Sequence, residues 1–211
     1  MFDSIIDIID MDVDKVSDVV SAALENDYDE ESINTLTNSV SRVASDFGIP
    51  TPEVYISPGS YGEHMTNDPS TYLDDKIGAD PKIVDLINGK YGHPRAYDVV
   101  MAHEMTHAQI GASGLRSEMT AKCEEMICDA KAGLYAGTHN LPAEVFRGEI
   151  GSSSGDCEHP AGNERCEVFE RAYKIAHDYP FRDFRPVTAD LTQIPKVEAL
   201  FNDVVSAYNR A

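Results

Sequence analysis

The sequence predicts an α+β fold that is mostly helical and carries a small mixed sheet. Apolar residues recur at three- and four-residue spacing over several long stretches, which is the period of one helix face. Between two such stretches, Val54-Tyr55-Ile56 follows a proline-rich break and has the composition of a short strand. The chain has 211 residues, which is enough for one domain with a buried core.

Residues 1–47 are expected to form an N-terminal helical segment. Residues 12–27 and 30–47 each place apolar side chains on one face, and Gly48 is a typical end for the second helix. Residues 59–78 are rich in Gly, Asp, Asn and Pro, which indicates a loop with one edge strand near residues 61–65. Residues 81–88 predict a short helix with Asp80 as its N-cap and Gly89 as its end.

Residues 102–107 read Ala-His-Glu-Met-Thr-His and match the pattern HExxH on a helix that Gly111 would end. Helix positions four apart share a face, so His103 and His107 can direct two imidazoles at one cation. Glu104 falls beside that face, where its carboxylate can reach a water on the metal without acting as a ligand. Zinc suits this set because imidazole is one of its usual ligands. Two buried core histidines are the alternative interpretation.

A second helix is predicted over residues 117–136, with a serine cap at its start and Gly137 at its end. Glu125 and Asp129 lie four apart on it, one helical turn. This spacing is similar to that of gluzincin metallopeptidases, in which the glutamate binds zinc and the aspartate orients a ligand histidine. Glu124 is a competing ligand, but one turn further on it meets Cys128, which is not a partner of the expected kind.

The C-terminal third becomes polar after residue 137. Residues 151–156 indicate a flexible loop, which leads into residues 157–165 and then into a helix that is expected to run to about His177. Residues 181–211 are expected to form a linker and a last helix, beginning at Pro195, that packs on the same core. The apolar residues that this helix is expected to bury are Val197, Leu200, Phe201, Val204, Val205 and Tyr208.

The charge balance excludes some partners. Seventeen basic and 37 acidic residues give a formal net charge of −20, which argues against nucleic acid and anionic membranes and is compatible with a basic protein partner. No apolar run approaches the roughly 18 residues of a membrane span. The acidic N-terminus does not resemble an export signal. Cys123, Cys128, Cys157 and Cys166 form no CxxC pair, so we expect free thiols in a cytoplasmic protein, with a helix-to-loop disulfide as the alternative.

Several segments, in order, resemble the gluzincin peptidases typified by HtpX and the CAAX prenyl endopeptidases. The segments are residues 47–55, the HExxH helix, the Glu125–Asp129 helix, and His159-Pro160 followed by Arg165, and they span roughly residues 43–175. The resemblance implies a zincin-like catalytic domain over residues 48–180 with one bound zinc ion. The roles that it implies are zinc ligands at His103, His107 and Glu125, a general base at Glu104, an orienting acid at Asp129, a transition-state donor at His159, and a brace at Arg165.

The expected function is a zinc-dependent endopeptidase that acts on protein or peptide substrates. Family members are usually membrane-embedded, and this sequence has no spanning segment, so membrane-linked substrates are not implied. One alternative is a repressor-cleaving HExxH peptidase. Another is a non-catalytic, zinc-stabilised acidic binding module. The intact Glu104 argues against the latter, because a structural zinc site has no use for a base.

Overall fold

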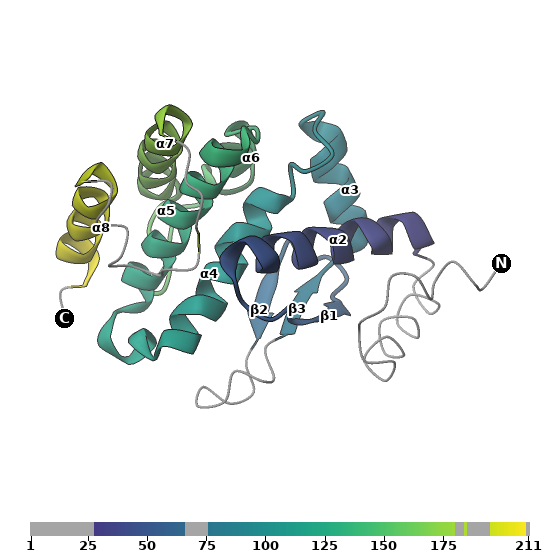
Figure 1. Ribbon diagram of the computed structural model, residues 1–211, viewed down its shortest axis with the longest axis horizontal. Helices are drawn as coiled ribbons and strands as arrows, with labels where there is room; N and C mark the ends of the chain where they lie inside the picture. Colours follow the sequence, from purple (N-terminus) through teal and green to yellow (C-terminus); the bar gives the residue numbers. More distant parts are fainter. Residues whose placement is uncertain (1–27, 66–75, 180–183, 185–194, 210–211) are drawn as a thin grey trace.

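The computed structural model describes residues 28–65, 76–179, 184 and 195–209. It confirms a mostly helical α+β fold with a small sheet (Figure 1). The helix expected over residues 12–27 and most of the expected linker lie outside the described residues. The helices are α2 (Glu30–Phe47), α3 (Pro81–Lys90), α4 (Asp98–Ser113), α5 (Ala121–His139), α6 (Glu144–Ile150), α7 (Gly162–Asp178) and α8 (Pro195–Tyr208).

The sheet has three strands, β1 (Glu53–Ile56), β2 (Glu63–Met65) and β3 (Lys76–Ala79), in the order β1-β3-β2. β1 runs parallel to β3, and β2 runs antiparallel to it. The central strand β3 lies in a segment that the sequence indicated to be mostly loop. It has a single β-branched residue, Ile77, so its strand conformation depends on pairing on both sides rather than on its own propensity.

The expected end of α2 is confirmed, whereas those of α3, α4 and α5 were wrong. α3 continues through Gly89 to Lys90, and Tyr91 is its C-cap. Gly48 adopts a left-handed conformation with φ of 65° and closes α2. α4 continues through Gly111 to Ser113, because Gly114, with φ of 72°, is the residue that turns left-handed there. α5 begins after the cap Thr120 and continues through Gly137 to His139, where Asn140 turns left-handed.

Gly133 and Gly137 serve a different purpose, the close approach of α5 and α7. A Cβ atom on Gly133 would lie 2.3 Å from the carbonyl oxygen of Phe169, and one on Gly137 would lie 2.3 Å from that of Tyr173. Both distances are far below van der Waals contact. The two glycines therefore let the backbone of α7, which carries Arg165, pass directly against α5.

We expect Gly133→Ala to destabilise the protein by about 1–3 kcal/mol, because the added methyl group must push α7 away in a close-packed core. Gly89→Ala is the matched control, since that helical glycine has nothing within 4 Å of an added Cβ. The control should be neutral or stabilising by up to about 1 kcal/mol through helix propensity. Denaturant unfolding measures both values, and equal midpoints for the two variants would contradict the close-approach interpretation.

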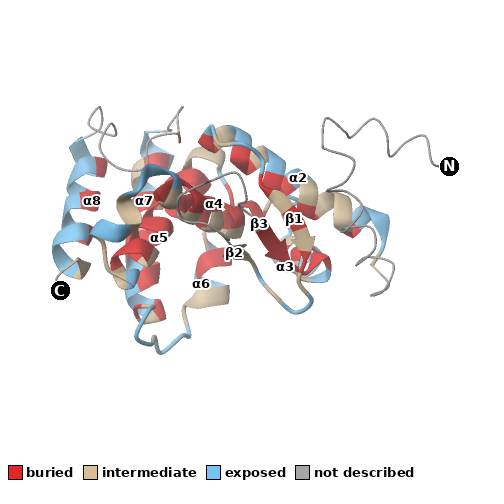
Figure 2. Ribbon diagram, turned by 90° about the horizontal axis from the view of Figure 1, so that it is seen from below, coloured by how far each residue is buried: buried red, intermediate tan, exposed pale blue. Residues whose placement is uncertain are grey.

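The described helices share one hydrophobic core, to which α2 and α8 contribute along with α4, α5 and α7. Figure 2 shows its buried residues where α4, α5 and α7 meet. α8 is confirmed and buries Val197, Leu200, Phe201 and Val204. Val205 was expected to be buried, but it is 39% exposed because it lies about 100° around the helix from Val204. The short helix α6 was not foreseen.

The position of α4 is fixed by a buried carboxylate at its first residue. Asp98 forms ion pairs of 2.8 Å with Arg42 of α2 and 2.7 Å with Arg95. It also accepts a 2.7 Å hydrogen bond from Ser39. These contacts hold α4 against α2 and so fix the position of the HExxH residues relative to the core.

None of the helices in the described residues has both the length and the apolar content to cross a membrane. All four cysteines lie within the described residues, and each is a free thiol.

Candidate metal centre

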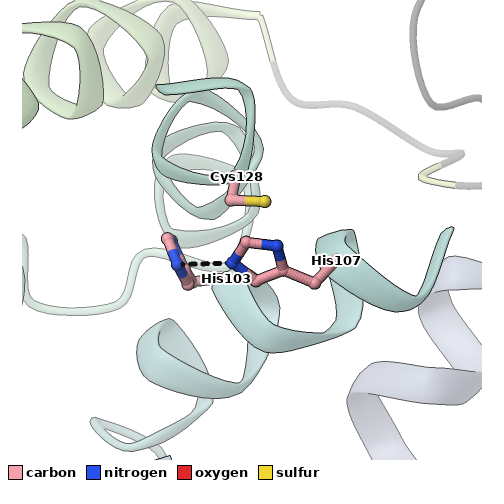
Figure 3. Close-up of side chains that lie close together, drawn as sticks. All are labelled: His103, His107 and Cys128. Atoms are coloured by element: carbon pink, nitrogen blue, oxygen red, sulfur yellow. Dashed lines mark hydrogen bonds between the residues drawn. The ribbon is translucent and has the colours of Figure 1, made fainter. Parts of the chain in front are cut away.

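The two histidines of the HExxH pattern meet on the face of α4 that packs against α5. Their Nε2 atoms lie 3.1 Å apart, as the dashed line in Figure 3 shows. His103 is buried, and His107 is partly buried. The four-residue spacing of the sequence therefore produces the expected convergence of two imidazole nitrogens.

Glu125 and Asp129 of α5 approach these rings from opposite ends. The Glu125 carboxylate lies beside both Nε2 atoms, with Oε1 at 3.2 Å from that of His107 and Oε2 at 3.4 Å from that of His103. Asp129 Oδ1 lies 2.9 Å from the other ring nitrogen of His103, Nδ1. The predicted one-turn spacing therefore places one carboxylate in front of the histidine pair and one behind it.

Arg165 of α7 holds both of these carboxylates. Its Nε and Nη2 each donate a 2.8 Å hydrogen bond to Asp129, one to each carboxylate oxygen. Nη2 also lies 3.0 Å from Oε2 of Glu125. Arg165 thus contacts both carboxylates, in a position that suits the bracing role implied by the sequence resemblance. It reaches them because α7 passes directly against α5.

Glu124 has a partner that the sequence did not reveal. Its Oε1 accepts a 2.7 Å hydrogen bond from Nδ1 of His107. Arg116, in the 3₁₀ turn Leu115–Glu118, donates to the same carboxylate. The partner of Glu124 is therefore His107 on another helix, and not the residue one turn further along α5. The sequence held only one sign that Glu124 belongs to the site, its position next to Glu125. Its contacts could not be foreseen, because they come from another helix and from a turn.

His103, His107 and Cys128 form a cluster whose donor atoms lie within 4.8 Å of one another and that could hold a metal ion. The sequence indicated Cys128 only as the residue one turn after Glu124 and as a free thiol, not as a metal ligand. In Figure 3 its sulfur lies beside the His107 ring, away from the dashed line that joins the two histidines. The site therefore offers sulfur as well as carboxylate donors.

The charges around the histidines change their acid–base behaviour. Burial lowers the pKa of His103, but Asp129 and Glu125 outweigh burial and raise that pKa to about 9. Burial raises the pKa of Glu125, but the two histidines outweigh it and hold this pKa well below its ordinary value. Burial raises the pKa of the Cys128 thiol to about 12. The site favours positive charge between the carboxylates.

A cleft of about 360 Å³ opens in front of the histidine pair. One wall comes from the residues before β2, where the Tyr97 hydroxyl donates a 2.6 Å hydrogen bond to the carbonyl oxygen of Tyr61. Gly62 lies so close to α4 that a Cβ atom on it would be 3.3 Å from Cγ of Glu104. The lining residues are Tyr61, Gly62, Val99, Val100, His103, Glu104, His107, Glu125, Val145, Phe146, Glu149, Ile150, His159 and Arg165.

Glu104 differs from the other carboxylates of this cleft. Within the described part of the chain, Glu125 and Glu149 are held by ion pairs, whereas the Glu104 carboxylate forms neither an ion pair nor a hydrogen bond. Its side chain is therefore available to groups that enter the cleft.

His159 lies at the rim of the cleft, on the loop before α7. Its Nε2 is 3.9 Å from Oε1 of Glu125, beyond hydrogen-bond distance. Asp156 receives 2.8 and 2.7 Å hydrogen bonds from the backbone N–H groups of Glu158 and His159 and lies 3.0 Å from the His159 Nδ1. The loop thus fixes the ring so that Nε2 points toward the site.

Comparisons with known proteins found nothing similar to this chain. No protein-family model matches it, and no curated protein or solved structure does.

Proposed function

We propose that this protein is a zinc-dependent endopeptidase of the gluzincin type. The observation that carries the proposal is the position of Glu104, an uncommitted carboxylate that opens on a cleft beside a convergent pair of histidine nitrogens. The order of HExxH, the Glu125–Asp129 pair and Arg165 along the chain supports the same assignment.

The proposed zinc ligands are His103, His107 and Glu125. Three ligand atoms that each lie about 2.0–2.1 Å from zinc in a tetrahedral arrangement are about 3.3–3.4 Å apart. Here the two Nε2 atoms lie 3.1 Å apart, and each has a different Glu125 oxygen beside it, Oε1 at 3.2 Å from that of His107 and Oε2 at 3.4 Å from that of His103. Three protein ligands leave the fourth position open, as catalytic zinc sites do.

The charge of the surroundings also suits a divalent cation. Glu104, Glu124, Glu125 and Asp129 supply four negative charges, and Arg116 and Arg165 supply two positive ones. With neutral imidazoles, the sum is four minus two, or two negative charges. A bound dication would balance that charge in a partly buried site.

When bound, zinc supplies Lewis-acid chemistry that lowers the pKa of a water and polarises a peptide carbonyl. Glu104 would take the proton of the attacking water and return it to the leaving amine. His159, held by Asp156, would donate a hydrogen bond to the carbonyl oxygen as negative charge develops on it.

The proposed substrate is an extended peptide segment. The cleft runs beside the residues that lead into β2, an edge strand of the sheet, and an edge strand can pair with an added peptide strand. Apolar side chains line the remainder of the cleft and would receive an apolar residue of the substrate. These side chains are Val99, Val100, Val145, Phe146 and Ile150.

A peptide-library digest with and without chelator tests the proposal. We expect the zinc-reconstituted protein to contain one zinc ion per chain by elemental analysis and to cleave peptides at internal bonds. Chelation should abolish cleavage, and added zinc should restore it. A protein that takes up no metal, or one whose cleavage survives metal removal, would contradict the proposal.

A further inference from the structure

The two histidines of the candidate metal centre have similar groups behind their rings. Behind each ring, on its Nδ1 side, lies a carboxylate from α5, and each carboxylate is bound by an arginine. For His103 these residues are Asp129 and Arg165. For His107 they are Glu124 and Arg116. The sequence resemblance implied the first set, and nothing in it implied the second.

The contacts of the second set are short and multiple. Nδ1 of His107 lies 2.7 Å from Oε1 of Glu124, and Nη2 of Arg116 lies 2.7 Å from the same oxygen. Nε of Arg116 is 3.1 and 3.2 Å from the two carboxylate oxygens. Nη2 also lies 3.4 Å from the carbonyl oxygen of His107. Arg116 thus contacts both the Glu124 carboxylate and the backbone of His107, whose ring binds that carboxylate.

The turn that carries Arg116 is itself held by the C-terminal end of α8. Asn209 donates a 2.9 Å hydrogen bond to the carbonyl oxygen of Glu118 and accepts one of 2.9 Å from the N–H of Thr120. The Thr120 hydroxyl donates to the carbonyl oxygen of Tyr208 at 2.7 Å. These bonds fix the C-terminal end of the turn, so the position of Arg116 does not depend on its ion pair alone.

We propose that Glu124 and Arg116 are positioning residues that hold His107 in its metal-binding orientation. A hydrogen bond from Nδ1 to Glu124 fixes the ring and leaves Nε2 as the nitrogen for the metal. Arg116 fixes the rotamer of Glu124 and offsets its charge. The proposal rests on the metal centre of the proposed function but assigns two residues that the reaction itself does not use.

Zinc affinity of the purified full-length protein, measured in competition with a chelator of known affinity, tests the proposal. We expect Glu124→Ala to weaken zinc binding by about 10–100-fold, the usual effect of removing a group that orients a metal-binding histidine. Glu124→Gln should restore most of the affinity, because its amide oxygen still accepts from Nδ1. Arg116→Ala should weaken binding less than Glu124→Ala does.

The double variant Glu124→Ala/Arg116→Ala should bind zinc about as well as Glu124→Ala alone, since Arg116 acts through Glu124. Glu118→Ala is the matched control, because it removes a carboxylate from the same turn and should leave the affinity unchanged. Denaturant unfolding of each metal-free variant checks that it folds. Arg116→Ala, which should still weaken zinc binding, provides the test if Glu124→Ala does not fold.

Three outcomes would overturn the inference. These are full affinity in Glu124→Ala, a loss in the Glu118→Ala control equal to that in Glu124→Ala, and a double variant that loses the sum of the two single effects. Zinc affinity is measured without substrate. A protein that binds zinc but cleaves no peptide would therefore refute the proposed function alone, and an active protein whose Glu124→Ala variant keeps full affinity would refute this inference alone.

Discussion

Glu104→Gln is expected to abolish peptidase turnover while the protein still binds one zinc ion per chain. The amide is nearly isosteric with the carboxylate but cannot accept a proton, and general-base catalysis contributes about 10²–10⁴-fold. The Glu104 carboxylate forms no ion pair or hydrogen bond among the described residues, so the substitution breaks no polar bond of the fold. The measurements are kcat on a cleaved library peptide, elemental analysis, and the midpoint of denaturant unfolding.

His159→Ala is compared with Glu104→Gln and is expected to lower kcat without abolishing it. His159 lies at the rim of the cleft rather than beside the histidine pair, and loss of a single oxyanion donor costs about 10²–10³-fold in kcat. We expect unchanged zinc content in His159→Ala and little change in KM.

If Glu104→Gln retains turnover near that of the unchanged protein, the base must be another residue and the proposed mechanism is wrong.

The second large effect is expected at Glu125. Glu125→Ala should weaken zinc binding by more than the about 10–100-fold that follows the loss of an orienting residue, because it removes a proposed ligand itself. The carboxylate lies beside both Nε2 atoms, and no other described carboxylate approaches both. Competition with a chelator measures the affinity.

Cys128→Ala is the matched control at the neighbouring donor. The sulfur belongs to the cluster with His103 and His107, but it lies beside the His107 ring rather than between the two Nε2 atoms (Figure 3). We therefore expect Cys128→Ala to keep its zinc. The opposite pair of results, with zinc lost from Cys128→Ala and retained by Glu125→Ala, would establish sulfur as the third ligand and remove Glu125 from the ligand set.

The sequence by itself determined the parts of this protein that depend on local periodicity. Apolar residues at helical spacing were sufficient to locate α2 and α8, and the four-residue spacing of HExxH was sufficient to bring His103 and His107 together. The same holds for Glu125 and Asp129, one turn apart on α5. Each of these features is set within one or two helical turns, where backbone hydrogen bonds fix the geometry.

Only the tertiary structure decided what each glycine does. Gly48 ends its helix, whereas Gly137, which carries the same local signal, lies inside α5 because the backbone of α7 occupies the space of its missing side chain. Strand β3 likewise exists because β1 and β2 pair with it on either side. In both cases the deciding contact comes from a segment distant in the chain.

The partners of the metal-centre residues were decided in the same way. Arg165 reaches Asp129 across 36 residues of sequence, and Glu124 meets His107 across 17. No local pattern encodes such pairs, because a carboxylate on a helix surface is compatible with many partners until packing brings one of them within hydrogen-bond distance. The spacing of HExxH therefore determined which two imidazoles converge, and the packing of α5 and α7 and the turn at Arg116 determined what holds their rings in place.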